Sequence, residues 1–208
     1  MTVSFKDAGK RFNQDWIFRH LDYTFDSSLK YAIVGGNGSG KSTLLKSILG
    51  YSPLSEGSMQ CTLNGNDLSH EATYKHFSFC SPYMELYEEL NLTELVDFHK
   101  KLKPLKAELD TESFIERIEL GHAKKKPVKY FSSGMKQRVR LGLAILSNTE
   151  ALLLDEPISN LDKKAINWYK ELVQEEIDGR LVVVESNLTE DEYFFSTEIL
   201  NVEDFKNR

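Results

Sequence analysis

The sequence predicts an α/β fold built around a phosphate-binding loop. Residues 35–42 read Gly-Gly-Asn-Gly-Ser-Gly-Lys-Ser, follow an apolar run at 31–34 and open a helical pattern. A second apolar run, 151–154, leads into Asp155 and Glu156, as a central parallel strand does when it delivers carboxylates to a site. Strand, glycine turn and helix in this order distinguish a phosphate loop from a chance match to Gly-x-x-x-x-Gly-Lys-Ser.

The residue types of this loop suit a phosphate group. Glycines let the backbone turn so that several N–H groups point inward. The N-terminus of the following helix adds unpaired N–H groups and the positive end of a dipole. Lys41 is predicted to reach the terminal phosphates, and the Ser42 hydroxyl to bind Mg²⁺. The alternative is a glycine-rich turn with a solvated lysine, but a chance match in a chain this long is roughly a one-per-cent event.

Composition and charge limit the class of protein. The 208 residues are 40% hydrophobic and 28% charged, which suits one compact domain or a core with a subdomain. The net charge of −6 argues against a nucleic-acid protein whose affinity depends on a large basic face. Lysines at 124–126 and 129 form a local basic cluster, which we interpret as a solvated surface, with anion steering as the alternative.

No feature predicts a membrane span or a metal cluster. No apolar run approaches the roughly 18 residues that a spanning helix needs, and the first residues do not resemble a signal peptide. We therefore expect a soluble chain whose membrane role comes through a partner. Cys61 and Cys80 lack a metal-ligand spacing, so we expect them to pack in the interior of a reduced, cytoplasmic protein.

Short strands are predicted before the phosphate loop. Alternating apolar residues at 3–5 and at 21–25 indicate two strands, with a turn expected at 9–11. Phe12 precedes the second strand and, taken alone, would be assigned to packing. After the loop, further strands are expected at 59–63, which ends in the hairpin signal Asn64-Gly65, and at 76–80.

A helical block is predicted between these strands and the strand at 151–154. Asn91 and Asp110 are expected to cap two of its helices, and Ser132 or Ser133 a third. A block of this size, inserted between strand–helix units, is a candidate subdomain. The third helix is either an ordinary capped helix or a second phosphate-binding helix end, since serine hydroxyls and free N–H groups suit an anion.

Asp155 and Glu156 are candidate catalytic residues. Asp155 at the strand end can bind Mg²⁺ through water, and Glu156 can orient an attacking water. Two acids before a turn are otherwise common at protein surfaces, but the upstream phosphate loop favours a function. Another buried strand, 181–184, points residues 185–187 toward the same edge of the sheet.

Taken together, these motifs resemble those of ATP-binding cassette (ABC) ATPases, the motor subunits of ABC transporters. Residues 35–42 match the Walker A loop, and 131–135 stand where the family has its Leu-Ser-Gly-Gly-Gln signature. Residues 152–156 match Walker B with its catalytic glutamate, and 159–162 match the D-loop. Phe12 falls where an aromatic ring stacks on adenine. The resemblance covers nearly all of the chain, and its length and variants are similar to those of small, single-cassette bacterial subunits.

The resemblance implies a P-loop NTPase fold in one nucleotide-binding domain, residues 1–208. It implies a RecA-like core (about 1–80 and 137–208), an antiparallel β part near the N-terminus and an inserted helical subdomain (about 81–136). The implied activity is hydrolysis of ATP with Mg²⁺, by a head-to-tail homodimer or heterodimer that encloses two ATP molecules. The implied partners are integral membrane permease subunits at the inner face of the cell membrane, and no nucleic acid is expected.

The resemblance also assigns roles residue by residue. Catalytic roles fall to Glu156, Lys41 and Asn187. Mg²⁺ is assigned to Ser42, Asp155 and, through a bound water, Ser81. The D-loop is formed by Ser159, Asn160, Leu161 and Asp162, and ATP binding is assigned to Phe12, Gly35, Gly36, Asn37, Gly38, Ser39, Gly40, Lys41, Ser42, Thr43, Ser132, Ser133 and Gly134.

Some positions depart from the family's pattern. Ser81 or Pro82 stands in place of a glutamine; Ser81 could hold a Mg²⁺-bound water, whereas Pro82 could not donate a hydrogen bond. Asn187 replaces the switch histidine and can hydrogen-bond a γ-phosphate, but it cannot carry a proton. Ser133 and Met135 replace a glycine and a glutamine of the signature.

Because Glu156 and Lys41 are intact, we expect slowed but real hydrolysis. Two other functions stay open. One is a nucleotide-gated regulatory module that dimerises with ATP and barely turns over, suggested by Asn187 and the missing glutamine. The other is a soluble ABC ATPase acting on nucleic acid or the ribosome, although such relatives usually carry two cassettes or long coiled-coil insertions.

Overall fold

The computed structural model describes residues 1–107 and 109–206, and the chain falls into two compact units. The first unit contains residues 1–77, 149–156 and 179–206, and the second contains the described residues of 78–148 together with 157–178. These boundaries differ from the division into core and helical subdomain that the sequence suggests, because the helices after residue 132 belong to the second unit. That functional division stays a prediction.

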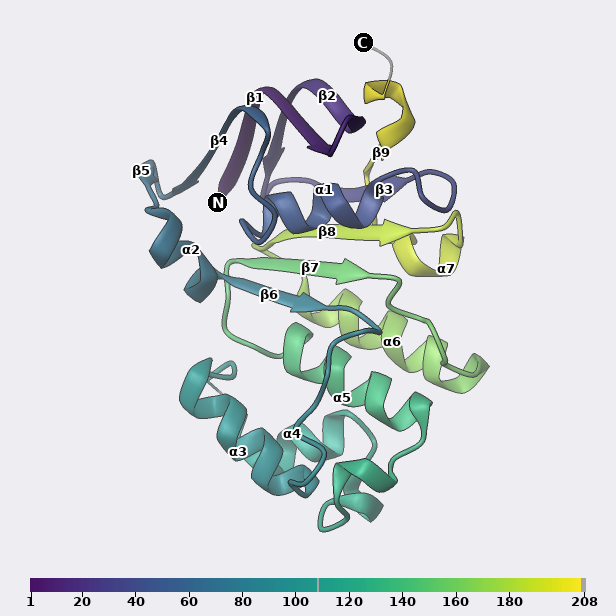
Figure 1. Ribbon diagram of the computed structural model, residues 1–208. Helices are drawn as coiled ribbons and strands as arrows, with labels where there is room; N and C mark the ends of the chain where they lie inside the picture. Colours follow the sequence, from purple (N-terminus) through teal and green to yellow (C-terminus); the bar gives the residue numbers. More distant parts are fainter. Residues whose placement is uncertain (108, 207–208) are drawn as a thin grey trace. The chain divides into compact units, whose positions relative to one another are not determined.

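One sheet of the first unit is antiparallel, with the strand order β2-β1-β4-β5 (Figure 1). It contains β1 (Thr2–Phe12), β2 (Asp15–Asp26), β4 (Glu56–Leu63) and β5 (Asn66–Asp67). The turn expected at residues 9–11 is wrong, because they continue β1, whose register with β2 shifts repeatedly between Phe5 and Arg11. A bulge interrupts the regular alternation of a strand, so residues that do not alternate still belong to β1. The hairpin at Asn64-Gly65 is confirmed, with φ of 51° and 79°.

The other sheet of this unit holds four parallel strands in the order β7-β8-β3-β9. They are β3 (Lys30–Val34), β7 (Ala151–Asp155), β8 (Leu181–Ser186) and β9 (Glu198–Asn201). Helix α1 (Lys41–Ile48) packs on β3, β7 and β8 (Figure 1). Neighbouring parallel strands end at the same edge of a sheet. The phosphate loop 35–42 follows β3, Glu156 follows β7 and Asn187 follows β8, so all three lie at this edge. The unit also contains α2 (His70–His76), α7 (Glu190–Tyr193) and a 3-10 helix, Val202–Phe205.

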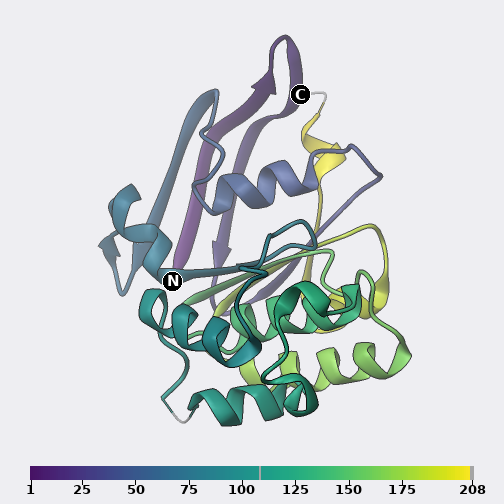
Figure 2. The same ribbon diagram turned by 60° about the horizontal axis from the view of Figure 1, so that its bottom comes forward.

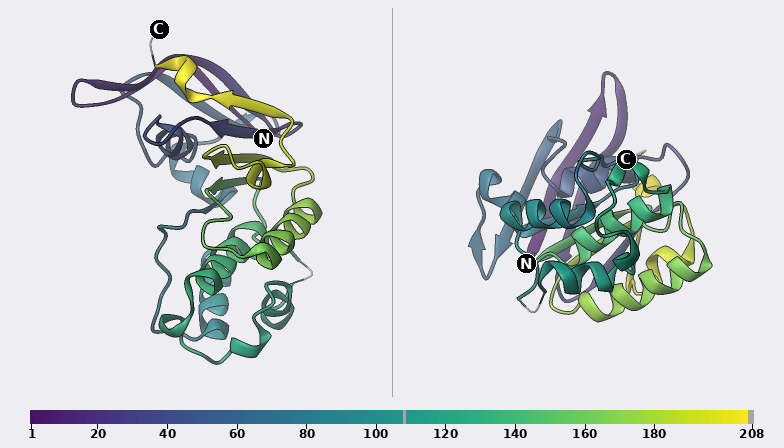
Figure 3. Two further views of the ribbon diagram at one scale, coloured as in Figure 1. Left: turned by 90° about the vertical axis from the view of Figure 1, so that its right-hand side faces the viewer. Right: turned by 90° about the horizontal axis from the view of Figure 1, so that it is seen from below.

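The second unit is mainly helical (Figures 2 and 3). After β6 (Phe77–Cys80), where the chain enters the unit, it contains α3 (Leu92–Leu102), α4 (Thr111–Arg117), α5 (Ser133–Ile145), α6 (Lys163–Glu176) and 3-10 helices at Gly121–Ala123 and Val128–Tyr130. The expected caps are confirmed: Asn91 forms a capping box on α3, Asp110 caps α4, and Ser132 rather than Ser133 caps α5.

Helix packing in the second unit depends on close contacts and on part-buried ion pairs. Gly142 of α5 lies against Ile118 and Phe114, and the Trp168 indole N–H of α6 donates to the Arg117 carbonyl at 2.7 Å. The carboxylate of Glu176 pairs with Lys106 and Arg117. Its pKa is lowered by these two cations, which outweigh the opposing and largest single contribution, desolvation by burial.

The remaining features of the sequence have structural explanations. Both cysteines are buried and unbridged, and burial raises the pKa of the Cys61 thiol to about 11, as suits a packing residue. Lys124 and Lys129 form ion pairs with Glu112 and Glu89, in accord with a solvated charged surface. Within the described residues, no helix is both long and apolar enough to cross a membrane.

Candidate functional site

The phosphate loop lies in the first unit, between β3 and α1. Gly35, Gly38 and Gly40 all have positive φ, and a Cβ on Gly40 would lie 2.3 Å from the Ile17 Cγ2 atom. Glycine is therefore required at residue 40 both by its backbone conformation and by space. Helix α1 begins at Lys41 without a side-chain cap, so its first N–H groups are free to bind an anion.

The ammonium of Lys41 is surrounded by hydrogen-bond acceptors of the first unit, and the residue is only 4% exposed. It donates to the Gly35 and Gly36 carbonyls at 3.1 Å each and to Asn187 Oδ1 at 2.6 Å. It also pairs with Glu185 Oε1 at 3.2 Å. A buried lysine surrounded by acceptors is a cation fixed in place, ready for an anionic ligand.

Ser42 and Asp155 meet at the same place. Ser42 Oγ lies 3.5 Å from Asp155 Oδ1, although the two residues are 113 positions apart in the chain. Asp155 is the last residue of β7 and is only 4% exposed. A hydroxyl and a carboxylate supply the hard oxygen ligands that Mg²⁺ prefers, so these residues fit that ion.

Glu156 follows β7 in a strained conformation. Its φ of 41° lies in the left-handed region, which an L-residue adopts only when its surroundings enforce it. Its backbone N–H donates to the Glu185 carbonyl at 3.2 Å, and its Oε1 accepts a hydrogen bond from the Asn187 side-chain amide. The three residues given catalytic roles by resemblance, Glu156, Lys41 and Asn187, are therefore joined through Asn187.

Glu185 is a further residue of this site, and sequence reasoning gave it no role. It lies opposite Asp155 in the register of β7 and β8, and it is only 2% exposed. Burial, followed by the neighbouring Asp155 carboxyl, raises the pKa of Glu185 well above its usual range, against the opposing effect of Lys41. The available signal was an acid that directly follows the apolar run 181–184 and still lies within the buried strand β8.

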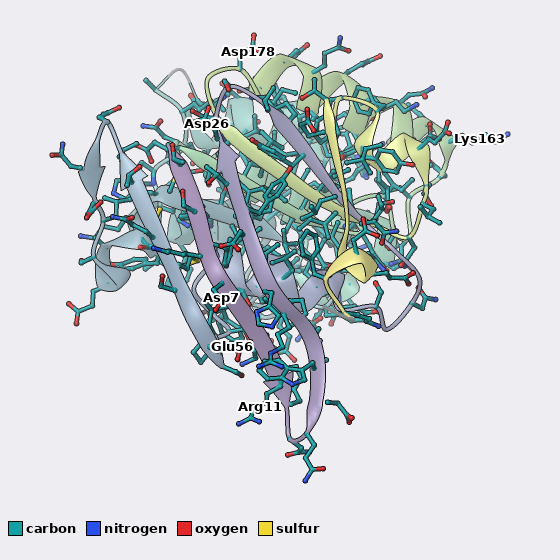
Figure 4. All side chains as sticks on the ribbon, turned by 90° about the horizontal axis from the view of Figure 1, so that it is seen from above. Asp7, Arg11, Asp26, Glu56, Lys163 and Asp178 are labelled. Atoms are coloured by element: carbon teal, nitrogen blue, oxygen red, sulfur yellow. The ribbon has the colours of Figure 1, made fainter. Side chains whose placement is uncertain are left out.

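Phe12 is the last residue of β1 and is 52% exposed. Lys10 Nζ lies 5.0 Å from the centre of the ring, within range of a cation–π interaction. The labelled neighbour Arg11 lies near the free end of the β1–β2 hairpin, and Asp26 lies at the opposite end (Figure 4). An exposed aromatic ring is suited to stacking on a planar ligand.

The signature and D-loop residues lie in the second unit. The Ser132 side chain accepts from the Met135 N–H at 3.2 Å, and both Ser132 and Ser133 are exposed at the start of α5. A Cβ on Gly134 would lie 3.1 Å from the Asn160 carbonyl oxygen, so this helix start and the D-loop are closely packed. They line a cavity of about 480 Å³ whose described lining residues all belong to this unit; Ser132, Ser133, Gly134, Asn160, Leu161 and Asp162 are among them.

Ser81 is also in the second unit and is only 4% exposed. Its hydroxyl oxygen accepts from the Tyr83 N–H at 3.4 Å. Its expected contact with a Mg²⁺-bound water stays a prediction.

Comparison with known proteins shows the family of this fold and site. The family model described as "ABC transporter" matches residues 18–159, which is more than half of the chain. The chain therefore belongs to the ABC transporter family and is an ABC-type ATPase with the P-loop NTPase fold that the sequence predicted.

The relatives include an uncharacterised ABC transporter ATP-binding protein, YybJ, from Bacillus subtilis (strain 168). It is 29% identical over 184 residues, 88% of this chain and 84% of YybJ. The maltose/maltodextrin import ATP-binding protein MalK of Vibrio parahaemolyticus is 34% identical over 165 residues. That match covers 77% of this chain and only 44% of MalK, so the chain spans less than half of that relative.

A solved structure of the cassette MJ0796, described as a dimeric post-hydrolysis state bound to ADP and Pi, has the same fold. Its TM-score is 0.79 at 19% identity, and the match covers 97% of this chain and 95% of that chain.

Proposed function

We propose that this ATPase energises transport across a membrane by pairing with a second cassette around ATP. In this proposal two cassettes bind head to tail and enclose two ATP molecules, and the cycle of closing and opening moves integral membrane permease subunits at the cytoplasmic face. Support comes from the family and from the relatives YybJ and MalK, which are named as ATP-binding proteins of transporters.

The first unit supplies the hydrolytic half of the site. Lys41 and the N–H groups of the phosphate loop would bind the phosphates, and Ser42 and Asp155 would hold Mg²⁺. When bound, Mg²⁺ neutralises charge that develops on the phosphate oxygens. Glu156 would accept a hydrogen bond from the attacking water and orient it, while Asn187 would hydrogen-bond the γ-phosphate.

The second unit supplies the other half. The observation that carries the proposal is the exposed start of α5, where Ser132, Ser133 and Gly134 line a cavity together with the D-loop. The hydroxyls and the helix N-terminus suit the γ-phosphate of an ATP molecule held by another cassette. Hydrolysis would remove the anion that the two helix starts share, and the pair would open.

Complementation between two inactive variants tests this pairing. Lys41→Ala prevents binding of the chain's own ATP, and Ser132→Asp places a negative charge where the γ-phosphate should lie while keeping an N-cap side chain. Each variant also carries Glu156→Gln to block hydrolysis. Neither variant alone can form a complete site in a head-to-tail pair, but a mixture restores one complete site.

The expected result is that light scattering with ATP shows monomers for each variant alone and a mixed dimer for the two together. Glu156→Gln alone, with two complete sites, serves as the positive control. Dimers of either variant alone, or monomers in the mixture while the positive control dimerises, would contradict a composite site.

The permease is tested separately, by copurification from cells that express the chain with its neighbouring genes. The proposal predicts an integral membrane protein in the purified complex and faster ATP hydrolysis by the complex than by the isolated cassette. Copurified nucleic acid or ribosomal protein, without a membrane protein, would favour the soluble ABC function instead.

A further inference from the structure

The 3-10 helix Val202–Phe205 lies against the phosphate loop of the first unit. Strands β9 and β3 are parallel neighbours, and their last residues, Asn201 and Val34, are register partners. The segments that follow these strands, the 3-10 helix and the loop, therefore start side by side at one edge of the sheet. Val202 is fully buried, and its Cγ1 atom would lie 3.3 Å from a Cβ on Gly35. Strand pairing and packing thus hold this helix on the loop.

The side chain of Glu203, in this 3-10 helix, forms a hydrogen bond with the backbone of the loop. Its Oε1 accepts from the Gly36 N–H at 3.2 Å, and the same oxygen would lie 3.4 Å from a Cβ on Gly36. The Asn201 side chain accepts from the Glu203 N–H at 3.1 Å and so caps the helix that carries the carboxylate. No motif of the family resemblance includes Glu203, yet it contacts the Walker A loop directly.

The peptide group that Glu203 contacts is also bound by Lys41, at its other end. The Gly36 N–H and the Gly35 carbonyl belong to one planar peptide group, in which they point in opposite directions. Lys41 Nζ donates to that carbonyl at 3.1 Å. A cation at the oxygen and an anion at the N–H polarise the group in the same sense, so each hydrogen bond strengthens the other. Rotation of this peptide group would break both bonds at once.

We propose that Glu203 is a positioning residue of the ATP site, which fixes the peptide group between Gly35 and Gly36 as an acceptor for Lys41. Two successive glycines restrict their own backbone least, so a contact from outside the loop is needed to fix it. The lysine side chain has four rotatable bonds, and its acceptors determine where the ammonium lies before nucleotide binds. This inference rests on the proposed role of Lys41 in binding the phosphates.

The hydrogen bond and the charge of Glu203 have opposite effects on nucleotide affinity. Glu203 is an exposed anion beside a loop that binds anionic phosphates, so repulsion alone would make its removal tighten binding. Loss of an acceptor for the Gly36 N–H would instead weaken binding. Glutamine separates the two effects, because its amide oxygen can still accept from Gly36 but carries no charge.

The test titrates a fluorescent ATP analogue, with Mg²⁺, into the whole chain as wild type, Glu203→Ala, Glu203→Gln and Asp204→Ala. Asp204→Ala is the matched control, because it removes the same charge from the next residue of the 3-10 helix. We expect about fivefold weaker binding for Glu203→Ala and affinities within about twofold of wild type for Glu203→Gln and Asp204→Ala. Thermal unfolding of the same samples should show no fall in melting temperature, because Glu203 is exposed.

Three results would overturn the inference: wild-type or tighter binding by Glu203→Ala, equal weakening by Glu203→Ala and Glu203→Gln, or equal weakening by Glu203→Ala and Asp204→Ala. Lys41→Ala is titrated in parallel. Wild-type affinity in Lys41→Ala would overturn the proposed phosphate site and this inference with it. Lost binding in Lys41→Ala together with wild-type affinity in Glu203→Ala would overturn the inference alone. The titration concerns one cassette and nucleotide, so failure of the dimer or permease proposal would leave its outcome unchanged.

Discussion

The side-chain amide of Asn187 joins Lys41 to Glu156. Its oxygen accepts from Lys41 Nζ at 2.6 Å, and its nitrogen donates to Glu156 Oε1. An amide has one acceptor and one donor group, so it can bridge an ammonium and a carboxylate without gaining or losing a proton. A histidine at this position would perform a similar bridge with a group that titrates near neutral pH.

Variants of Asn187 should separate the effect of its two hydrogen bonds on hydrolysis from the effect of a titratable charge at this position. Asn187→Ala removes both hydrogen bonds and should lower the rate of ATP hydrolysis by about tenfold or more, with a smaller effect on nucleotide binding. Asn187→His should retain activity and acquire a step in its pH–rate profile near pH 6.5, which the wild-type amide does not provide. Steady-state ATPase assays between pH 5.5 and 8 check both results. An unchanged rate in Asn187→Ala would exclude the bridge from the reaction.

Glu156→Gln should abolish hydrolysis while preserving the site. The amide can still accept from Asn187, but it is a much weaker base toward water, so turnover should fall by about a hundredfold or more. Nucleotide affinity should stay within a few-fold of wild type. The comparison also decides between motor and regulatory module: equally slow hydrolysis by wild type and Glu156→Gln, with membrane partners present, would favour the nucleotide-gated module.

The phosphate loop could be predicted because its chemistry is local. All the residues that define it lie within 35–42, and strand and helix patterns flank them. Asp155 and Glu156 were predictable for a similar reason, because an apolar run ended in acids. The link from Lys41 to Asn187 spans 146 positions, and it exists because β3 and β8 are neighbours in the sheet. A single sequence does not encode that pairing in any local pattern.

Glu185 shows a different limit. Its side chain is polar, but its strand is buried on both faces, and periodicity alone gives no reason for an acid there. Its place beside the nucleotide site becomes apparent only from the structure, in which it pairs with Lys41 and is the register partner of Asp155. The turn predicted at residues 9–11 was wrong for a related reason. These residues belong to β1, and the register shifts there depend on how β1 pairs with β2 and β4, which its own residues do not reveal.

His99 should make the protein less stable in acid. Burial, followed by the charge of Lys103, lowers the pKa of His99 from 6.5 to about 4, while its Nε2 lies 2.9 Å from Ser147 Oγ. The unfolded chain then binds a proton that the folded chain does not between pH 6.5 and 4. Its stabilising contribution is complete above pH 6.5 and is lost as the pH falls, by up to ~3 kcal/mol at pH 4.

Urea unfolding of wild type and His99→Gln between pH 4 and 7 measures this effect. Glutamine can still hydrogen-bond Ser147 but does not titrate, so the loss of stability in acid should be smaller in the variant. Carboxylates such as Glu176 contribute to acid unfolding in both proteins and cancel in the difference. Parallel stability curves for the two proteins would show that His99 is not the group responsible.

Gly142 should be intolerant of even one methyl group. A Cβ there would lie 2.3 Å from Ile118 Cγ2 and 3.1 Å from Phe114 Cζ, and both side chains are fully buried. Gly142→Ala gains about 1 kcal/mol of helix propensity, but the overlap should outweigh it and leave the free energy of unfolding ~1–3 kcal/mol lower. Gly121→Ala is the control in the same unit, because no atom lies within 4 Å of a Cβ there and its φ is not positive. It should stay within about 0.5 kcal/mol of wild type in urea unfolding. If Gly142→Ala proved as stable as Gly121→Ala, the close packing of α5 against α4 would not be the reason for a glycine at residue 142.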